Sequence, residues 1–378
     1  MGTSAVANNA KVNKAKLPPL DMPFLVLVIL VLISGLVMLF SASYAAGLSD
    51  EGDSMYYIKR QLFAAVIGVI AMFVASRFNY RLYRRLSWVI AGISVLLLIA
   101  VYPFGVKVNG ARRWLSIGVR FQPSEIAKIG VILLLAYFIT YYYDKINDFR
   151  YGIGIPLGSA LFFAGLVLFE PHLSGAILIG IIGIVMIFVG GANWKHLLIC
   201  IVIIALLFGL MAVTTGYMNS RIKAWLDPWS SPRDDGYQII QSLYAIGSGG
   251  LMGLGLGNSQ QKYGYLPEAH NDYIFSVACE ELGFIGAVVI ILLFALLVWR
   301  GFRIALKAED KFGCLICVGI MTQVGAQTLL NIAVVSNAIP STGISLPFFS
   351  YGGTSLVLLL LEMGVVLNIS RYSNTEKG

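Results

Sequence analysis

The sequence Leu266-Pro267-Glu268-Ala269-His270-Asn271-Asp272-Tyr273-Ile274-Phe275 joins a polar loop to a long apolar run over residues 273–299. Three ionisable residues, Glu268, His270 and Asp272, come just before that run. If the run spans a bilayer, Asp272 lies near the boundary between water and hydrocarbon. Desolvation there raises the pKa of a carboxyl group and suits it to general-base work. We therefore expect the rest of the chain to hold this loop over a membrane.

The composition indicates a membrane protein. Of the 378 residues, 58% are hydrophobic and only 12% are charged, whereas charged residues make up about a quarter of an ordinary soluble protein. This excludes the usual soluble classes, and nucleic acid is not expected as a partner. The four cysteines (Cys200, Cys279, Cys314 and Cys317) all fall in apolar segments. We interpret them as small buried hydrophobic residues, not as a disulfide framework or a metal site.

Ten apolar runs of about 17 residues or more predict ten transmembrane helices. They are 24–46, 61–76, 86–104, 124–143, 152–169, 173–191, 196–216, 273–299, 312–336 and 353–370. The expected fold is an all-α polytopic membrane protein with one membrane domain, 24–370. A long loop, 217–272, separates the seventh and eighth spans, and polar tails, 1–23 and 371–378, flank the domain.

The distribution of lysine and arginine predicts that both termini are cytoplasmic, because positive residues are retained on that side. Two loops expected outside, 105–123 and 217–272, are nevertheless basic. An anionic lipid head group, especially a pyrophosphate, would explain them, because arginine binds phosphate oxygens bidentately. Adhesion to ordinary anionic lipid, or solvation of a loop, is the alternative. Residues 237–247 have the spacing of an amphipathic helix, which would suit the membrane interface.

Polar residues inside the predicted spans are functional candidates, since such residues are rare at membrane depth. Glu125 and Lys128 are spaced i, i+3, so they form either a structural ion pair or an ion pair that faces a cavity. Gln323, Gln327 and Asn331 form one stripe, which faces either neighbouring helices or a polar cavity. Three further acids, expected to point into the bundle, are Glu280, Glu281 and Glu362.

The last loop expected outside, 340–354, is rich in Pro, Gly and hydroxyl side chains. Ser341, Thr342 and Ser350 can donate hydrogen bonds to an oxygen-rich ligand. Proline and glycine stop helix here and permit tight turns. By composition the loop is either a re-entrant segment or a stiff connector.

Four motifs occur in order along the chain. They are Asn109-Gly110-Ala111-Arg112-Arg113-Trp114, Gln122-Pro123-Ser124-Glu125-Ile126-Ala127-Lys128, Pro267-Glu268-Ala269-His270-Asn271-Asp272, and Pro340-Ser341-Thr342-Gly343 running to Ser350-Tyr351-Gly352-Gly353. From about residue 20 to 370 the chain resembles the SEDS family (shape, elongation, division and sporulation), the peptidoglycan polymerases that include RodA, FtsW and SpoVE. The form around Asp272 is more similar to the division and sporulation branch. His172 stands where many relatives have an acid, so a role for that acid is in doubt here.

The resemblance implies a glycosyltransferase of the bacterial cytoplasmic membrane that uses lipid II as donor and acceptor, with its active site facing outside. Asp272 aligns with the essential aspartate, whose implied role is the general base. Arg112, Arg113 and Lys128 are candidates to stabilise the pyrophosphate leaving group, and Glu268 and His270 either orient Asp272 or only shape the turn. The candidate substrate-binding residues are Arg112, Arg113, Glu125, Lys128, Glu268, His270, Ser341, Thr342 and Ser350.

The resemblance also implies partners. A class B penicillin-binding protein would supply transpeptidation, and other divisome or elongasome membrane proteins are expected. A divalent cation, Mg or Mn, would assist the pyrophosphate, although the sequence contains no dedicated ligand cluster. Two other functions stay open: a lipid II flippase, and a non-catalytic divisome scaffold for which Asp272 is dispensable.

Overall fold

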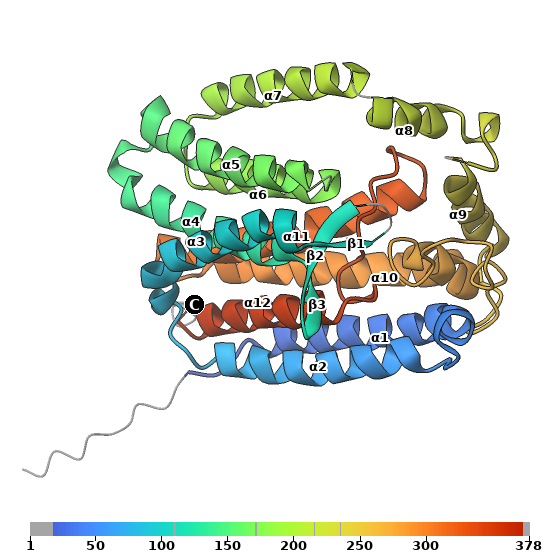
Figure 1. The fold of residues 1–378 in the computed structure, drawn as a ribbon. Coiled ribbons are helices and arrows are strands. Elements are labelled where there is room, and N and C mark those ends of the chain that lie inside the picture. The colour runs from blue at the N-terminus through green and yellow to red at the C-terminus, as the bar shows by residue number, and fades with distance from the viewer. Residues whose placement is uncertain (1–17, 109–110, 171, 215, 235, 373–378) are drawn as a thin grey trace, which may run out of the picture.

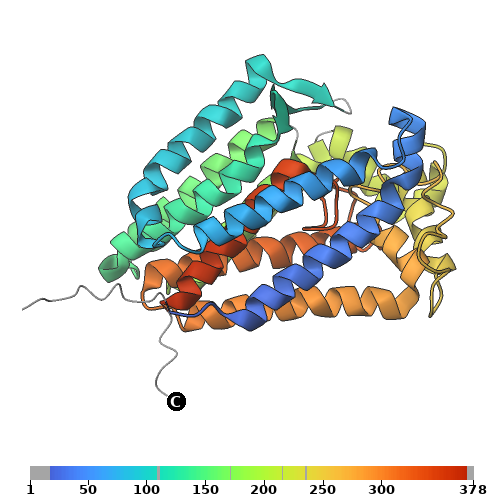
Figure 2. The same ribbon diagram turned by 90° about the horizontal axis from the view of Figure 1, so that it is seen from below.

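The computed structural model describes residues 18–372, apart from residues 109–110, 171, 215 and 235. Its long helices lie side by side in one bundle (Figure 1). Helices α1 (Met22–Glu51), α2 (Tyr56–Ala75) and α12 (Gly353–Arg371) form one side, which faces the viewer in Figure 2. Helices α5 (Ile155–Phe169), α6 (Leu173–Val189) and α7 (Trp194–Thr214) form the opposite side.

The ten predicted spans all correspond to helices. Within the described residues, eight helical segments are long and apolar enough to cross a membrane. They are α1, α2, α3 (Arg81–Phe104), α4 (Pro123–Tyr141), the segment Arg150–Phe169 that contains a π-helical turn and α5, α10 (Ile274–Leu306), α11 (Lys311–Val335) and α12. Two shorter apolar helices, α6 and residues Trp194–Leu206 of α7, match the sixth and seventh predicted spans.

The first and last helices meet at one end of the bundle. Asp21 caps α1 by accepting a hydrogen bond from Phe24 N at 2.9 Å, and its own backbone N–H donates to Ser370 Oγ at 3.2 Å. The Asp21 carboxylate also pairs with Arg300 of α10 at 2.7 Å. One residue thus satisfies a helix N-terminus and joins three helices. The ten predicted spans, an even number, would place the two ends of the membrane domain on the same side, as observed here.

Small residues let α2 and α12 pack closely. A Cβ added to Gly364 would lie 2.3 Å from the carbonyl oxygen of Met72, and one added to Gly68 would lie 2.5 Å from Leu360 Cδ1. Such contacts replace the hydrophobic driving force that is absent between helices in lipid. The α2–α12 pair therefore forms a firm wall beside the loop that precedes α12.

Residues 105–123, for which the sequence predicts only a loop, contain a small antiparallel sheet. Strands β1 (Val106–Val108), β2 (Ala111–Ile117) and β3 (Val119–Phe121) follow one another in order, with Lys107 opposite Arg112 and Ser116 opposite Arg120. Gly118 adopts a positive φ of 76° and makes the tight turn between β2 and β3. The strands are too short to be recognised against the long apolar helices around them.

The long segment 217–272 is also partly helical. It contains most of α8 (Gly216–Leu226), a 3-10 turn (Pro228–Ser230) and α9 (Tyr237–Ser248), which is the helix predicted from the amphipathic spacing. Beyond α9 the chain runs along the first turns of α10. There Leu254 N and Gly255 N donate to the carbonyls of Glu280 and Glu281, both at 3.0 Å.

Buried charges lock this segment onto α10. Glu281 pairs with Lys262 at 2.9 Å and accepts a hydrogen bond from Ser41 of α1 at 2.6 Å. Glu280 accepts one from Ser259 at 2.5 Å. Both acids are 1% exposed, so the expected burial is confirmed and their partners come from segments distant in sequence. At Gly283, φ is 67° and α10 kinks.

Candidate functional site

Asp272 lies immediately before α10, half-buried, and faces the loop that precedes α12. A Cβ added to Gly343 of that loop would lie 3.2 Å from Asp272 Oδ2, so the loop passes directly beside the carboxylate. Among the residues that the structure describes, no donor hydrogen-bonds to this carboxylate. Both oxygens are therefore available to accept a proton from a ligand.

The surroundings of Asp272 tune its acidity. Burial raises the pKa of Asp272 to about 6, and the nearby carboxylate of Glu268 adds to the rise. The guanidinium groups of Arg113 and Arg221 act in the opposite direction on this pKa. A carboxyl group with a pKa near 6 is mostly ionised at neutral pH yet is a stronger base than an ordinary aspartate, which suits general-base catalysis.

Glu268 and His270 shape the turn around Asp272. Glu268 has a φ of 56°, and its side chain accepts a hydrogen bond from Asn271 Nδ2 at 2.6 Å. The His270 ring packs against Tyr57, with ring centroids 4.5 Å apart. Burial lowers the pKa of His270, so the ring is neutral at physiological pH. In the described chain neither side chain hydrogen-bonds to Asp272.

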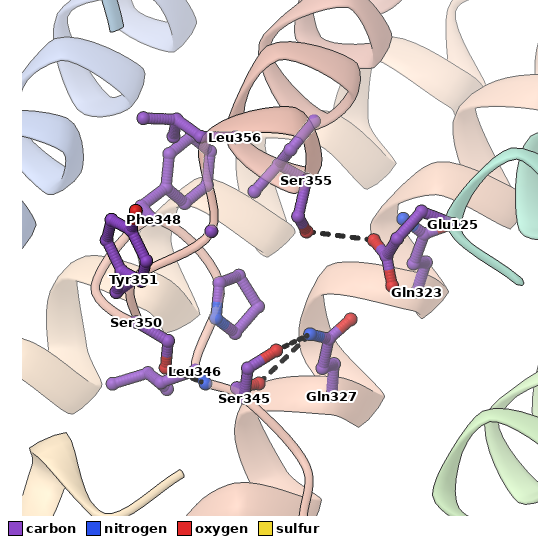
Figure 3. A pocket seen from close by; sticks show the side chains of 13 residues that line it. Glu125, Gln323, Gln327, Ser345, Leu346, Phe348, Ser350, Tyr351, Ser355 and Leu356 are labelled. Atoms are coloured by element: carbon purple, nitrogen blue, oxygen red, sulfur yellow. Dashed lines mark hydrogen bonds between the residues drawn. The ribbon is translucent and has the colours of Figure 1, made fainter. Parts of the chain in front are cut away.

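Glu125 and Lys128 form a buried ion pair on α4. Lys128 Nζ lies 2.8 Å from Glu125 Oε1, and the two side chains are 4% and 15% exposed respectively. Ser355 of α12 donates to Glu125 Oε2 at 2.9 Å (Figure 3). Lys128 donates to Gln327 of α11 at 3.3 Å. The pair thus ties three helices together.

Two small cavities, each lined by both polar and apolar residues, adjoin this pair, so the ion pair also faces a cavity. The first lies between α4, α11 and the loop before α12, as Figure 3 shows. The second lies toward the start of α6. Glu125, Gln327 and Ser345 line both cavities. A ligand in either space would meet the Glu125 carboxylate and several hydrogen-bonding groups, and a ligand in the second would also meet Lys128.

The three amide side chains of the α11 stripe hydrogen-bond to different neighbouring segments. Gln323 donates to Glu362 of α12 at 2.9 Å, and Gln327 donates to the Ser345 carbonyl at 2.9 Å. Asn331 donates to the carbonyls of Asp272 and Ile344, both at 2.7 Å. Both interpretations of the stripe therefore apply, because the amides bind neighbouring segments and two of them also line the first cavity.

The two arginines of β2 have different surroundings, because successive side chains on a strand point to opposite faces. Arg113 is half-buried and donates to the Glu170 carbonyl at 3.4 Å, and its charge acts on Asp272. Arg112 is exposed and donates to the Tyr102 carbonyl at 3.3 Å. The structure thus brings Arg113 toward Asp272 and leaves Arg112 outside this group.

The three hydroxyl residues expected to bind a ligand also have distinct surroundings. Ser350 donates to the Asn271 carbonyl at 2.7 Å and accepts from Leu346 N at 2.7 Å, so its hydroxyl is already engaged by the backbone. The Ser341 carbonyl accepts a hydrogen bond from Arg221, and the Thr342 carbonyl accepts one from Ser174. The side chains of Ser341 and Thr342 are half-buried beside Gly343.

Two residues near the site were not selected from the sequence. Arg221 of α8 was one of several basic residues in a long loop, and only its bond to Ser341 places it near Asp272. Glu170 is 2% exposed, and within the described chain neither of its carboxylate oxygens has a hydrogen-bond partner. Burial raises the pKa of Glu170 to about 8, and Arg113 opposes that rise. The Glu170-Pro171-His172 turn was the only sequence signal.

His172 lines the second cavity. Its Nδ1 lies 3.2 Å from Gln122 Nε2 and 3.4 Å from Ser124 Oγ. Burial lowers the pKa of His172 to about 3, and the charge of Arg113 adds to this. The imidazole is therefore neutral at physiological pH and serves here as a hydrogen-bonding group.

The described residues contain no group of three His, Cys, Asp or Glu side chains placed to hold a metal ion. The acid nearest the cavities, Glu125, is already paired with Lys128. The donor set that Mg or Mn prefers, several carboxylate and carbonyl oxygens around one point, is thus not assembled by these residues alone.

The sequence profile of the FtsW/RodA/SpoVE family, described as cell cycle protein, matches residues 21–375. The chain belongs to this family. Stage V sporulation protein E of Bacillus subtilis (strain 168) is 43% identical over 357 residues, covering 93% of this chain and 97% of that protein. A probable peptidoglycan glycosyltransferase FtsW of Geobacter metallireducens is 38% identical over 365 residues, covering 96% and 97%. The predicted family is thereby confirmed, and both relatives fall in its division and sporulation branch.

Solved structures share the fold of this chain. A chain from work on the structural coordination of polymerization and crosslinking by a peptidoglycan synthase complex matches with a TM-score of 0.80 and 31% identity, covering 94% of this chain and 99% of that one. RodA of Thermus thermophilus matches with a TM-score of 0.70 and 30% identity, covering 94% and 98%. This family member is accordingly a multi-pass helical membrane protein.

Proposed function

We propose that this chain is a peptidoglycan glycosyltransferase that polymerises lipid II into β-1,4 glycan strands at the outer face of the bacterial cytoplasmic membrane, for septal, spore or side-wall synthesis. The observation that carries the proposal is the Asp272 carboxylate, which accepts no hydrogen bond from the described residues and lies near Arg113 and Arg221. The names of the relatives support the same activity.

In the proposed reaction, Asp272 accepts the proton of the acceptor sugar's 4-hydroxyl. The freed oxygen attacks the anomeric carbon of the donor from the face opposite the pyrophosphate, so that a new C–O bond forms with inversion. The bond to the pyrophosphate breaks, and the electron pair leaves with the undecaprenyl pyrophosphate. At neutral pH the base is ready, because the pKa of Asp272 is about 6.

The leaving group needs positive charge more than it needs a proton, since a pyrophosphate is already a stable anion. Arg113 and Arg221, whose charges act on Asp272, are the proposed source of that charge. Lys128 would add to it from the wall of the second cavity. Preorganised cations at the leaving oxygens stabilise the transition state without rearranging during the reaction.

The proposed partner is a class B penicillin-binding protein, which would cross-link the strands. Its support is the similarity to a chain of a peptidoglycan synthase complex in which polymerization and crosslinking are coordinated. The outward orientation of the site rests on the arginine and lysine distribution of the sequence.

The test is glycan-strand formation from purified lipid II by the protein reconstituted with its penicillin-binding partner. Asp272→Asn should lower the rate by about 10²- to 10⁴-fold, the usual contribution of a general base, while lipid II binding is retained. Asp234→Asn, an exposed acid of the same long segment, is the matched control and should leave the rate unchanged. Undiminished polymer from Asp272→Asn would reject Asp272 as the general base, whereas no polymer from the wild-type complex would favour a flippase or a scaffold.

A further inference from the structure

Three consecutive backbone carbonyls of the Asp272 loop are each held by a group from elsewhere in the chain. The carbonyl of His270 accepts a hydrogen bond from Tyr351 N at 3.0 Å. That of Asn271 accepts one from Ser350 Oγ at 2.7 Å, and that of Asp272 accepts one from Asn331 Nδ2 at 2.7 Å. The position of the carboxylate is therefore set by contacts to its backbone.

Asn331 joins two segments through one amide group. Its Nδ2 donates both to the Asp272 carbonyl and to the Ile344 carbonyl, each at 2.7 Å, and the side chain is completely buried. An NH₂ group has two hydrogens, so both bonds form at once. Because Ile344 follows Gly343, this amide holds Gly343 beside the Asp272 carboxylate.

Ser350 links the Asp272 loop to the loop before α12 at a second point. Its single hydroxyl hydrogen goes to the Asn271 carbonyl, and its oxygen accepts Leu346 N (Figure 3). The hydroxyl thus has no hydrogen left for a ligand while the loop keeps this conformation. Ser350 fixes the turn at Leu346 and the Asp272 loop together.

We propose that Asn331 and Ser350 are positioning residues that couple residues 343–351 to Asp272, so that the two segments move as one unit. The proposal rests on the proposed function, because it assumes that Asp272 is the base. Ser345, Leu346 and Tyr351 of the coupled segment line the first cavity, so a sugar or phosphate bound there would contact the same backbone that places the base.

Two variants test the coupling. Asn331→Leu keeps the side-chain volume but removes both donors, and Ser350→Ala removes the hydroxyl. Each should lower kcat by about 10- to 100-fold, the cost of a misplaced catalytic group. Thr328→Val is the matched control, because among the described residues the buried Thr328 hydroxyl bonds only to Val324 of its own helix, at 2.8 Å.

The pH profile separates positioning from general destabilisation. A released loop admits water to Asp272, which lowers the pKa of its carboxyl group. The fall of kcat at acidic pH, the acid limb of the pH profile, should therefore move to lower pH in both variants. The charged groups that face Asp272, which are Glu268 on its own loop, Arg113 on β2 and Arg221 on α8, stay unchanged. A lower rate with an unmoved acid limb would mean a structural role only. Ser350→Thr, which keeps the hydroxyl, should restore the wild-type limb.

Amide hydrogen exchange tests the coupling independently of activity. In Asn331→Leu, peptides that cover residues 268–273 and 343–351 should exchange faster together, while peptides of α2 and α12 stay protected. Faster exchange in only one of the two segments, or in neither, would overturn the proposal. Since this measurement requires no substrate, its result stands even if Asp272→Asn proves fully active, which would reject Asp272 as the base, or if the wild type makes no polymer, which would reject the proposed function.

Discussion

Glu125 Oε1 and Lys128 Nζ lie 2.8 Å apart on α4, beside two small cavities, of which Glu125 lines both and Lys128 the second. Both charges are taken out of water, and each has one further partner, Ser355 or Gln327. Burying two charges repays its cost only when both remain paired and hydrogen-bonded. The pair therefore tolerates joint removal better than the removal of one member.

We predict that Lys128→Met lowers the free energy of unfolding by about 3–5 kcal/mol, because it leaves the Glu125 carboxylate buried and uncompensated. The double variant Glu125→Gln, Lys128→Met should recover much of that loss. Thermal unfolding in detergent measures both. Equal destabilisation in the single and double variants would show that the two charges are not coupled.

The fall of the polymerisation rate at acidic pH, the acid limb of its pH profile, should follow the protonation of Asp272. As pH falls through about 6, the carboxylate gains a proton and the rate of the proposed reaction drops. The nearby Glu268 carboxylate raises the pKa of Asp272, so Glu268→Gln should move this limb to lower pH. The glutamine oxygen can still accept from Asn271, which keeps the turn. A limb that stays in place in Glu268→Gln would mean that another group controls it.

The ionised Asp272 carboxylate should also lower the free energy of unfolding at neutral pH. Its folded-state pKa of about 6 lies above the ordinary value of 3.8, so the folded protein binds this proton more tightly than the unfolded chain. The contribution of this proton to the free energy of unfolding is present below about pH 4 and is lost as pH rises through about 6. Asp272→Asn stays neutral, so its unfolding temperature should exceed that of the wild type at about pH 7.5. At about pH 4 the difference should vanish, whereas a difference independent of pH would contradict this assignment.

The two arginines of β2 should not be equivalent. Arg113→Gln is expected to reduce kcat about 10-fold or more, since it removes positive charge near Asp272 and the proposed pyrophosphate site. Arg112→Gln alters an exposed side chain and should leave kcat within about twofold of wild type, as for other exposed positions. Parallel assays on lipid II compare them, and similar losses in both variants would place Arg112 at the site as well.

Hydrophobic run length was enough to locate the helices, because each span must satisfy its own backbone in lipid. The Glu125–Lys128 ion pair was also predicted, since ionisable residues in an apolar segment stand out. Asp272 was selected from its place just before an apolar run, and its catalytic role stays a prediction. The sheet at 106–121 was missed because its strands are only 3 to 7 residues long. The separation of Arg112 from Arg113 follows from that strand and was missed with it.

The remaining parts of the site depend on contacts between distant segments, which local sequence does not encode. Asn331 and Asp272 are 59 positions apart, and Lys128 and Gln327 are 199 apart. Ser350 was expected to bind a ligand because it is a hydroxyl in a polar loop. Only the folded chain reveals that its hydrogen belongs to Asn271.

The kink at Gly283 divides α10 into a short segment that leads back to Asp272 and a longer segment toward its C-terminus. The helix has 33 residues, about 50 Å at 1.5 Å per residue, which exceeds the hydrocarbon thickness of about 30 Å. About 15 Å of helix separates the kink from the end that carries Asp272. A tilt of about 4° at Gly283 thus displaces that end by about 1 Å, a distance that matters greatly to a reacting group. A small side-chain rearrangement that tilts α10 at Gly283 would therefore produce a larger displacement at Asp272, where the chemistry would occur.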